Sequence, residues 1–517
     1  MKLLMTHGYM FSGSGSNVYV QNLCRALVKT GHDVHLLCQE PTPFDYDFAN
    51  EHLAVGSDDI ENLGERETPY PGHCAVYNPY IGGLLPVYVY DDYPNWRVKT
   101  FLDLTDEEFE SYVNANVAAL CSVLASGGAE AVVTNHSVPG PLIARRALEG
   151  TNVPYTSIVH GSCLQYVSRK SEKYMRHTRN GLEGAKSIVA LSSHSAGTIA
   201  EDFPDMETQT LALPGGVDTD LFRPDARDPL ALAGLGGGPG RGPEQAEALL
   251  TTIGGGSSGA DLAGALRSIA GSYDARKHDV DAGERLGALL GGDSPVVIYV
   301  GKLIHSKGVH SLISAFARIH KETNVRLLIV GYGTFREGLQ ALTHALSKGD
   351  ERALETLAES GRLFEGGPAS PLEHFELSEK LVGRAAGMAG VVDFVGPLYH
   401  AELAKLLPAT EVAVVPSIFP ETFGLVAAEF AASGVVSFVA DHSGLREAGG
   451  YVGDGLPFET RVGMDGFEEN LARSLSEYLT LPEDERQRCR EIVRKNSVDR
   501  LSWSTLAEKI VETASAP

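Results

Sequence analysis

The sequence contains few cysteines, and their spacing is not that of a metal site or a disulfide framework. The six cysteines are scattered along the chain, with no C-x-x-C pair, whereas zinc sites and disulfide-rich folds depend on characteristic cysteine spacings. Cys24 and Cys38 lie in apolar stretches. We therefore expect reduced thiols in the core of a cytoplasmic protein.

The sequence also lacks a long apolar run and an excess of positive charge. No segment approaches the roughly 20 apolar residues that span a bilayer, and the apolar run at residues 1–5 is too short for a signal peptide. The chain carries 43 Lys and Arg against 67 Asp and Glu, a formal net charge of -24. Because the chain has no long apolar run, we expect no transmembrane segment. Because the excess of negative charge repels nucleic acids and anionic membranes, we expect no nucleic-acid partner.

What the sequence does contain is a recurring alternation of apolar strands and amphipathic helices. After a strand at residues 3–5 and a Gly-rich loop at 11–17, apolar residues recur at helical spacing from Val20 to Val28. Further strands are predicted at residues 34–38, 131–134, 156–159, 187–191, 296–300, 326–330, 412–415 and 436–439. Because strand–helix–strand units form parallel sheets, the sequence predicts an α/β fold with two doubly wound, Rossmann-like halves.

The two sets of strands and the length of 517 residues indicate two domains. We place the N-terminal Rossmann-like domain at residues 1–214 and the C-terminal one at residues 215–499. Residues 225–293 are rich in Gly, Ala and Pro, which predicts a flexible insertion that contains short helices. Residues from about 340 to about 390 follow a helical pattern and resemble a second insertion.

The richest motif follows the predicted strand at 412–415. Glu421 lies in a Pro-bounded loop, Gly424 stands where an Ala-rich helix is expected to begin, and Glu429 lies further along that helix. Free amides at a helix start bind anions, and a glycine lets a ligand approach the backbone. A carboxylate among apolar residues is costly unless something binds it, and sugar and ribose hydroxyls are suitable partners. The alternative is a solvated Glu429 and an ordinary loop carboxylate at Glu421.

A second motif follows the predicted strand at 296–300. Lys302 and Lys307 share one loop, with Gly301 before them and Gly308 after them. Loops at the carboxyl ends of parallel strands are where α/β proteins bind ligands, and two ammonium groups there would neutralise a diphosphate and stabilise it as a leaving group. The alternative is two solvated lysines in a turn.

Together these motifs resemble those of the family 4 retaining glycosyltransferases, a large group with the GT-B fold (glycosyl transferases group 1). That family shows Gly-Arg-x(4)-Lys-Gly after a strand and Glu-x(7)-Glu later in the chain. The matching residues here are Gly301, Lys302, Lys307, Gly308, Glu421 and Glu429. Lys302 replaces the usual Arg, which keeps the charge but loses the bidentate fork.

Further matches extend the resemblance over nearly the whole chain except the two insertions. They are Gly13 and Gly15, His160-Gly161, residues 214–218 before residues 222–224, residues 331–333 and Leu501-Ser502-Trp503. The family usually has Asn where Gly215 stands. The resemblance implies two Rossmann-like domains that face each other across a cleft, with residues from about 500 to 517 crossing back to the N-terminal, acceptor-binding domain. The C-terminal domain would bind a nucleotide-sugar donor.

The resemblance also implies roles for individual residues in the retaining transfer of a hexosyl unit from a UDP-, GDP- or ADP-sugar. Lys302 and Lys307 would hold the diphosphate, Glu421 the transferred sugar and Glu429 the ribose, while His160 would lie near the sugar or the reacting centre. The backbone would meet the ligand at Gly15, Gly301, Gly331, Phe423, Gly424 and Leu425. In the favoured front-face mechanism the departing phosphate takes the acceptor proton. No cofactor, protein nucleophile or obligatory metal is then expected.

Two other patterns imitate known motifs. Gly13 and Gly15 suggest a dinucleotide fingerprint, but Val18 stands at its third glycine position, so NAD binding is the weaker interpretation. Asp218 and Asp220 imitate a metal-binding D-x-D motif, although their context favours turn and capping carboxylates.

Two candidate acceptor contacts have less support. Asp91 and Asp92 lie among aromatic residues, where an ordinary exposed loop is the favoured interpretation. His136 follows a strand, and a loop histidine in water is favoured over an acceptor contact.

The motifs leave three classes of function open. Besides a glycosyltransferase, a GT-B sugar-nucleotide epimerase or phosphorylase and a non-catalytic sugar-nucleotide-binding protein are compatible with them. Residues 40–100 carry no readable acceptor code. The negative charge mildly favours a soluble small molecule or glycan as acceptor, and the sequence does not indicate an oligomeric state.

Overall fold

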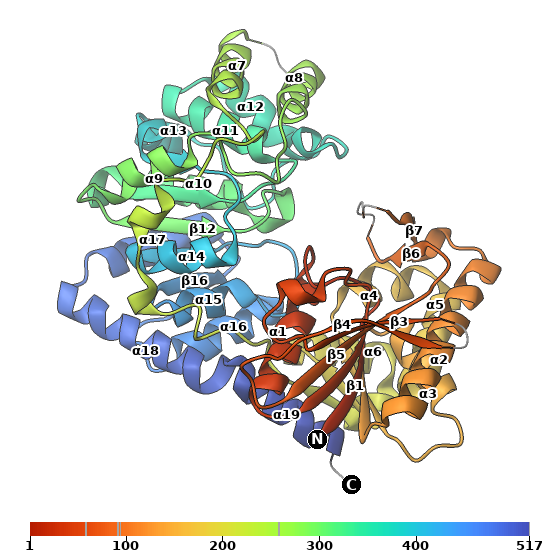
Figure 1. The fold of residues 1–517 in the computed structure, drawn as a ribbon. Helices are drawn as coiled ribbons and strands as arrows, with labels where there is room; N and C mark the ends of the chain where they lie inside the picture. The colour runs from red at the N-terminus through yellow and green to blue at the C-terminus, as the bar shows by residue number, and fades with distance from the viewer. Residues whose placement is uncertain (57–58, 90–92, 94, 257–258, 516–517) are drawn as a thin grey trace. The chain divides into compact units, whose positions relative to one another are not determined.

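The computed structural model describes residues 1–56, 59–89, 93, 95–256 and 259–515. The chain divides into two compact units. Unit 1 comprises Met1–Gly216 together with Leu501–Pro517, and unit 2 comprises Val217–Arg500. Each unit is built around its own mainly parallel sheet (Figure 1).

The sheet of unit 1 has the strand order β11-β10-β9-β8-β1-β2-β5-β3-β4 over the described residues. Its strands are β1 (Lys2–Thr6), β2 (Asp33–Leu37), β3 (Glu51–Val55), β4 (Ile60–Glu65), β5 (His73–Pro79), β8 (Ala131–Asn135), β9 (Tyr155–Val159), β10 (Ser187–Ala190) and β11 (Thr210–Ala212). All neighbouring pairs are parallel except β3–β4. From β1 the chain runs to β2 on one side and later returns to β8 on the other. The carboxyl ends of β1 and β8 therefore form a topological switch point, where open α/β sheets bind ligands.

Helices cover both faces of this sheet. They include α1 (Gly15–Lys29), α2 (Asp106–Gly127), α3 (Gly140–Ala147), α4 (Ser162–Tyr166), α5 (Glu172–Glu183), α6 (Ser193–Asp202) and α19 (Trp503–Ser515). Figure 1 shows α1 and α19 on one side and α2 and α3 on the other. The ring of Tyr19 meets that of Trp503 edge-on at 5.0 Å, which joins the last helix to the first. A separate pair of strands, β6 (Leu84–Val87) and β7 (Arg97–Thr100), lies parallel.

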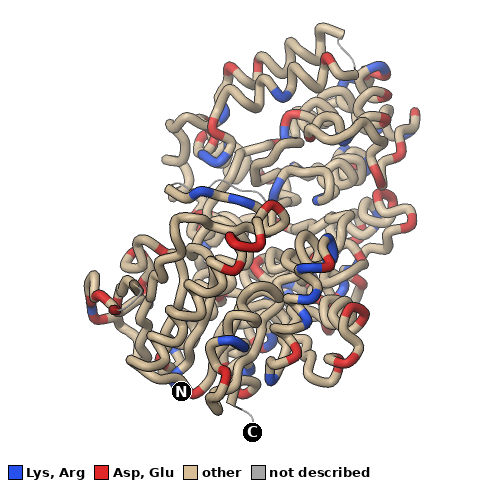
Figure 2. Tube along the Cα trace, turned by 90° about the vertical axis from the view of Figure 1, so that its right-hand side faces the viewer, with Lys and Arg blue, Asp and Glu red and all other residues tan. Residues whose placement is uncertain are grey.

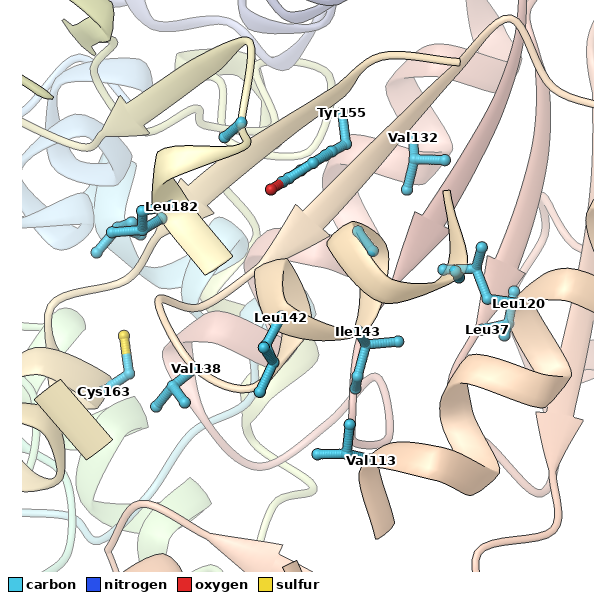
Figure 3. Packing of buried hydrophobic residues seen from close by; sticks show 14 of the residues in the cluster. Leu37, Val113, Leu120, Val132, Val138, Leu142, Ile143, Tyr155, Cys163 and Leu182 are labelled. Atoms are coloured by element: carbon cyan, nitrogen blue, oxygen red, sulfur yellow. The ribbon is translucent and has the colours of Figure 1, made fainter. Parts of the chain in front are cut away.

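Local sequence explains where these helices begin. Ser14 caps α1 by accepting a hydrogen bond from the amide of Asn17. Thr105 and Glu108 form a reciprocal capping box at the start of α2, which satisfies amides that have no partner within the helix. Behind the caps, Leu120 of α2, Ile143 of α3 and Val132 of β8 pack into one buried cluster (Figure 3).

The sheet of unit 2 is wholly parallel, with the order β14-β13-β12-β15-β16-β17 over the described residues. Its strands are β12 (Val296–Val300), β13 (Arg326–Val330), β14 (Val392–Phe394), β15 (Val412–Val415), β16 (Val436–Ala440) and β17 (Arg461–Val462). The central strands are continuous apolar runs because helices bury both faces of the sheet. These helices include α10 (Val309–Thr323), α14 (His400–Leu406), α15 (Leu425–Ala432), α16 (Ser443–Gly453), α17 (Phe467–Leu479) and α18 (Glu483–Leu501).

The segment at 225–293 was expected to be a flexible insertion with short helices; the short helices are present, and the described part of the segment is folded within unit 2. It forms α7 (Pro243–Gly254), α8 (Ala260–Ala270) and α9 (Ala282–Leu290), and Figure 1 shows α7 and α8 beside α11 (Arg336–Lys348) and α12 (Glu351–Glu359). Asp279, which is fully buried, accepts two hydrogen bonds from Arg336, at 2.8 and 2.5 Å, and one from Arg285 at 2.6 Å. A buried carboxylate needs such partners, and these contacts hold the segment in place. The Gly-, Ala- and Pro-rich composition had suggested flexibility, because composition does not reveal such contacts. Between 340 and 390 the structure adds α13 (Glu379–Ala385) after α11 and α12.

The structure shows how the charged residues and the cysteines are distributed. Acidic and basic residues are interspersed along the trace (Figure 2). Cys24 and Cys38 are buried and unpaired, so the prediction of free core thiols is confirmed. Within the described residues, none of the helices combines the length and the apolar character that crossing a bilayer requires.

Candidate functional site

The loops that follow β12 and β15 meet at one edge of the unit 2 sheet. β12 and β15 are parallel neighbours, so their carboxyl ends lie side by side. The Lys307 ammonium donates to Oε1 of Glu421. The amide of Ile418 also donates to the carbonyl of Ser306 at 3.0 Å. The structure therefore brings together two of the residues that the sequence placed in one site.

Glu421 is held in position by several neighbours. The hydroxyl of Ser417 donates to its Oε1 at 2.8 Å, and its own amide donates to Oγ of Ser443 at 2.9 Å. The amide of Gly444 donates to its carbonyl at 2.9 Å. The side chains of Glu421 and Lys307 remain 24% and 28% exposed, so both charges are oriented and still open to a ligand.

Two glycines allow this close approach. Gly308 has a φ of +64°, and a Cβ there would lie 2.0 Å from the carbonyl oxygen of Pro416. Gly424 caps α15 with a φ of +102°, and a Cβ there would lie 2.5 Å from Cδ2 of Leu445. Since L side chains rarely adopt such φ values, both positions demand glycine.

The remaining unit 2 residues predicted for the site differ in how far they are exposed to solvent. Lys302 is exposed, and its carbonyl accepts the hydroxyl of Tyr299 at 2.9 Å. Gly301 donates to the carbonyl of Val330 at 3.1 Å, and Gly331 to that of Gly396 at 2.9 Å. Phe423 is buried at 2% exposure, and Leu425 is the first residue of α15. These residues lie at the same strand ends, although no contact between Lys302 and Glu421 is seen among the described residues.

Glu429 has a partner that the sequence did not reveal. His400, at the start of α14, places Nε2 3.3 Å from Oε1 of Glu429. The hydrogen bond and the negative charge of Glu429 raise the pKa of His400. The Glu429 side chain is 18% exposed. His400 was missed as its neighbour because α14 carries no motif, although only a short 3-10 helix and β15 lie between α14 and α15 along the chain.

His160 belongs to unit 1, where it lies at the carboxyl end of β9. The amide Nδ2 of Asn135 donates to the carbonyl of Thr6 at 3.0 Å, which turns Oδ1 of Asn135 toward Nε2 of His160, 2.8 Å away. Nε2 is therefore the protonated nitrogen and Nδ1 carries a lone pair. Burial, with a smaller contribution from His7, lowers the pKa of His160 to about 3. His160 is a neutral hydrogen-bonding group.

His136 was expected in water, and this prediction is wrong. The residue is 2% exposed and has a φ of +70°. Its ring lies 4.4 Å from that of Tyr88 and 4.8 Å from that of His160, measured between centroids. The left-handed backbone directs the ring into an aromatic cluster, which spacing along the sequence does not reveal.

Three other sequence predictions concern loops. Asp218 accepts hydrogen bonds from the amides of Asp220 and Leu221 at 3.1 and 3.0 Å, so it is the turn carboxylate that was expected. Gly15 begins α1, and a Cβ there would meet nothing within 4 Å, which leaves its backbone open. The candidate acceptor residues Asp91 and Asp92 lie outside the described residues. In the part of the chain that is described, no group of three or more His, Cys, Asp or Glu side chains could hold a metal ion.

Comparisons with known protein families place both units in one class. Residues 14–215 match the model described as glycosyl transferase 4-like domain, and residues 287–352 and 375–496 match the model described as glycosyl transferases group 1. An uncharacterized glycosyltransferase of Methanocaldococcus jannaschii is 27% identical over 155 residues, which make up 30% of this chain and 29% of that protein. The match therefore spans less than a third of that relative.

Solved structures resemble the chain over its whole length. Sucrose-phosphate synthase from Thermosynechococcus elongatus gives a TM-score of 0.57 at 19% identity, covering 99% of this chain and 97% of that chain. The Anabaena protein HepE, in complex with UDP and glucose, gives a TM-score of 0.54 at 14% identity and full coverage of both chains, 100% each. At such identities the likeness shows the fold alone, and the predicted α/β architecture is confirmed.

Proposed function

The chain belongs to the family 4 glycosyltransferases of the GT-B fold, and we propose that it transfers a hexosyl unit from a nucleotide-diphosphate sugar with retention of configuration. The observation that carries the proposal is the contact between Lys307 and Glu421. It unites a cation suited to a phosphate and a carboxylate suited to a sugar hydroxyl at one strand edge. The Anabaena structure was solved with UDP and glucose, which supports UDP-glucose as the first donor to test.

The lysines supply positive charge for the diphosphate. An ammonium group has three N–H donors, and Glu421 occupies one of those of Lys307. No other partner of Lys307 is seen in the described part of the chain, so its other two donors can bind phosphate oxygens. Lys302, which is exposed in the same loop after β12, adds a second charge. Cations aimed at the departing phosphate lower the barrier to bond cleavage because negative charge develops there.

The carboxylates bind hydroxyl groups in this proposal. Glu421 accepts a hydrogen bond from a hydroxyl of the transferred sugar, and Glu429 accepts from the ribose. A preorganised carboxylate is effective because it does not have to be reoriented when the substrate binds. Ser417 and Ser443 provide that orientation for Glu421, and His400 provides it for Glu429.

His160 acts as a neutral group toward substrate bound to unit 1. With Nε2 donating to Asn135, its Nδ1 can accept a hydrogen bond from a substrate hydroxyl. Its lowered pKa argues against a role as a cation or a general acid near neutral pH.

The chemical step then needs no protein nucleophile. The acceptor oxygen attacks the anomeric carbon on the face that the diphosphate leaves, the bond from that carbon to the phosphate oxygen breaks, and the departing phosphate takes the acceptor proton. We propose that the reaction requires neither a cofactor nor an obligatory metal, because Lys302 and Lys307 provide the charge that a metal would provide.

The test is to incubate the protein with UDP-, GDP- and ADP-glucose and a set of acceptors, with and without a chelator. Nucleotide release and the anomeric configuration of the product are followed by NMR. Retained configuration in the presence of chelator is expected. An inverted product, loss of turnover with chelator, or conversion of the donor to an epimer would each contradict the proposal.

A further inference from the structure

A small pocket opens at the switch point of the unit 1 sheet. It lies at the carboxyl ends of β1, β2 and β8, where Thr6, Leu37 and Asn135 line it, and α3 contributes Ile143. Leu37 and Ile143 are labelled in Figure 3. The pocket holds about 30 Å³, room for roughly two water molecules. A whole sugar ring does not fit, but one hydroxymethyl group or a pair of hydroxyls does.

One wall of the pocket is formed by His136. His136 is 2% exposed, and neither of its ring nitrogens has a hydrogen-bond partner among the described residues. Thr6 Oγ1, at the end of the neighbouring strand β1, is likewise buried and unpartnered in that part of the chain. Buried polar atoms are almost always satisfied in native proteins, so these atoms indicate a ligand that the protein is built to receive.

The backbone fixes His136 in place. Its amide donates to the carbonyl of Ile158 at 2.8 Å, and its carbonyl accepts from the hydroxyl of Ser157 at 3.2 Å. The φ of +70° is unusual for a residue with a side chain. A strained, doubly anchored backbone with an unpartnered side chain is the pattern expected of a binding residue.

The pocket carries no charge. None of the described residues that line it is Lys, Arg, Asp or Glu. Burial and the nearby rings of His160 and His7 lower the pKa of His136, so its imidazole is neutral near pH 7. A neutral imidazole has one donor and one acceptor nitrogen, which match the two hydrogen-bonding roles of a hydroxyl group.

A phosphate is therefore a poor occupant. A phosphate monoester carries about 1.5 to 2 negative charges at pH 7, and burying that charge without a cation is costly. The rings of Tyr9 and Tyr88, 5.9 and 4.4 Å from that of His136, provide apolar surface for the C–H groups of a polyol.

We propose that this pocket binds an uncharged, hydroxyl-bearing end of the acceptor and that His136 is the residue that selects it. The inference rests on the proposed glycosyl transfer and adds the substrate class to it. The acceptor is neutral at the end that enters the pocket, such as an unphosphorylated sugar or polyol.

The direct test follows the ring nitrogens of His136 in the full chain labelled with ¹⁵N-histidine, assigned with His136→Asn. Glycerol and glucose are titrated in parallel with glycerol 3-phosphate and glucose 6-phosphate. We expect saturable shifts of the His136 signals with the neutral compounds and weaker ones with their phosphates. Equal or stronger shifts with the phosphates would overturn the proposal. It would also fail if no neutral compound gives a saturable shift, because the pocket would then hold only water.

A positive charge added to the pocket sharpens the test. Asn116 lines the pocket from α2 and is partly exposed, so Asn116→Lys should be tolerated. We expect this variant to shift the ratio of the two dissociation constants, glucose to glucose 6-phosphate, by about tenfold toward the phosphate. His194→Asn, an exposed histidine of α6, should leave the ratio unchanged. An unchanged ratio in Asn116→Lys would count against the pocket.

UDP binding, measured by thermal shift, separates this proposal from the function on which it rests. UDP should bind equally to wild type, Asn116→Lys and His136→Asn, because its proposed residues lie in unit 2. Shifts at His136 without transfer from any donor would contradict the proposed function and leave the pocket intact. Transfer to glucose 6-phosphate in preference to glucose would contradict the pocket and leave the function intact.

Discussion

The strand edge of unit 2 and the pocket of unit 1 handle charge in opposite ways. Lys307 and Glu421 stay about a quarter exposed and form an ion pair. His136, which lines the pocket, and its neighbour His160 are 2% and 8% exposed, and burial holds both in the neutral form by lowering their pKa values. Because the cost of a charge depends on its burial, the first region suits a charged ligand and the second an uncharged one.

The largest expected effect comes from removing the exposed charge. Lys307→Ala should lower kcat by roughly 100-fold, the usual result of deleting one group that stabilises developing negative charge. Lys302→Ala should mainly raise the donor KM, since no hydrogen bond or ion pair between Lys302 and Glu421 is seen among the described residues. Lys321→Ala, an exposed lysine of α10, is the matched control. These changes are measured by steady-state kinetics with the best donor. A normal kcat in Lys307→Ala would show that Lys307 does not take part in the reaction.

The Glu421 side of the pair can be tested by the same assay. Glu421→Gln keeps the shape and the hydrogen bond from Ser417 but removes the charge, so transfer should fall with little loss of UDP binding. Ser443→Ala should have a smaller effect in the same direction, because it removes only the hydroxyl that accepts from the Glu421 amide. If both variants turn over normally, the carboxylate has no role in transfer.

The next effect tests whether the two loops must touch. In Gly308→Ala the new Cβ would lie 2.0 Å from the carbonyl oxygen of Pro416, so the loop must move. We expect unit 2 to lose about 1–3 kcal/mol of stability and activity to fall with it. Gly287→Ala in α9 meets nothing within 4 Å and should be neutral or slightly stabilising. Equal melting temperatures for the two variants would show that the contact is dispensable.

The neutral histidines predict how unit 1 responds to acid. The pKa of His160 is about 3 in the folded state and about 6.5 when unfolded. Between these values the unfolded chain binds a proton that the folded chain does not. Stability therefore falls as pH drops below about 6.5, by about 1.4 kcal/mol per pH unit for each such histidine.

His160→Gln should reduce that slope by the contribution of one histidine. Hydrogen exchange in β8 and β9 between pH 7 and pH 5 reports it, because these strands belong to unit 1. His194→Gln, which is exposed, should leave the slope as in wild type. An equally steep slope in His160→Gln would mean that His160 is protonated in the folded protein.

Much of the fold followed from sequence periodicity, and the exceptions have different causes. The strands β12, β13, β15 and β16 of unit 2 and β1, β2, β8, β9 and β10 of unit 1 are mostly apolar runs, and these were predicted. The buried strand β5 and the short strands β14 and β17 were not predicted. The last two strands at one side of the unit 1 sheet, β3 and β4, were not predicted either. Their residues are mostly half-buried or exposed, so they carry no apolar run. The segment at 225–293 misled because its glycines suggested flexibility, whereas Asp279 anchors it through Arg336.

The candidate site could be predicted from the sequence only where its residues follow strands that are neighbours in the sheet. Lys307 and Glu421 follow adjacent parallel strands, so their proximity follows from topology together with the family motif. His400 reaches Glu429 from a helix with no motif. The burial of His136 depends on a single left-handed residue. Both are results of packing, which neither composition nor spacing encodes.

The smallest expected effect concerns the ion pair between His400 and Glu429 in unit 2. Its charge depends on pH, unlike that of the Lys307–Glu421 pair and unlike the neutral pocket of unit 1. The pKa of His400 is raised by Glu429, so the pair is fully formed below the ordinary histidine pKa. It is lost as pH rises through the raised value, and its stabilisation is modest because the His400 side chain is 48% exposed. His400→Gln should raise the donor KM a few-fold at low pH and have less effect at high pH, where wild type has already lost the charge. Donor KM measured across pH for both proteins tests this, and a KM ratio that does not change with pH would show that the His400 charge does not orient Glu429.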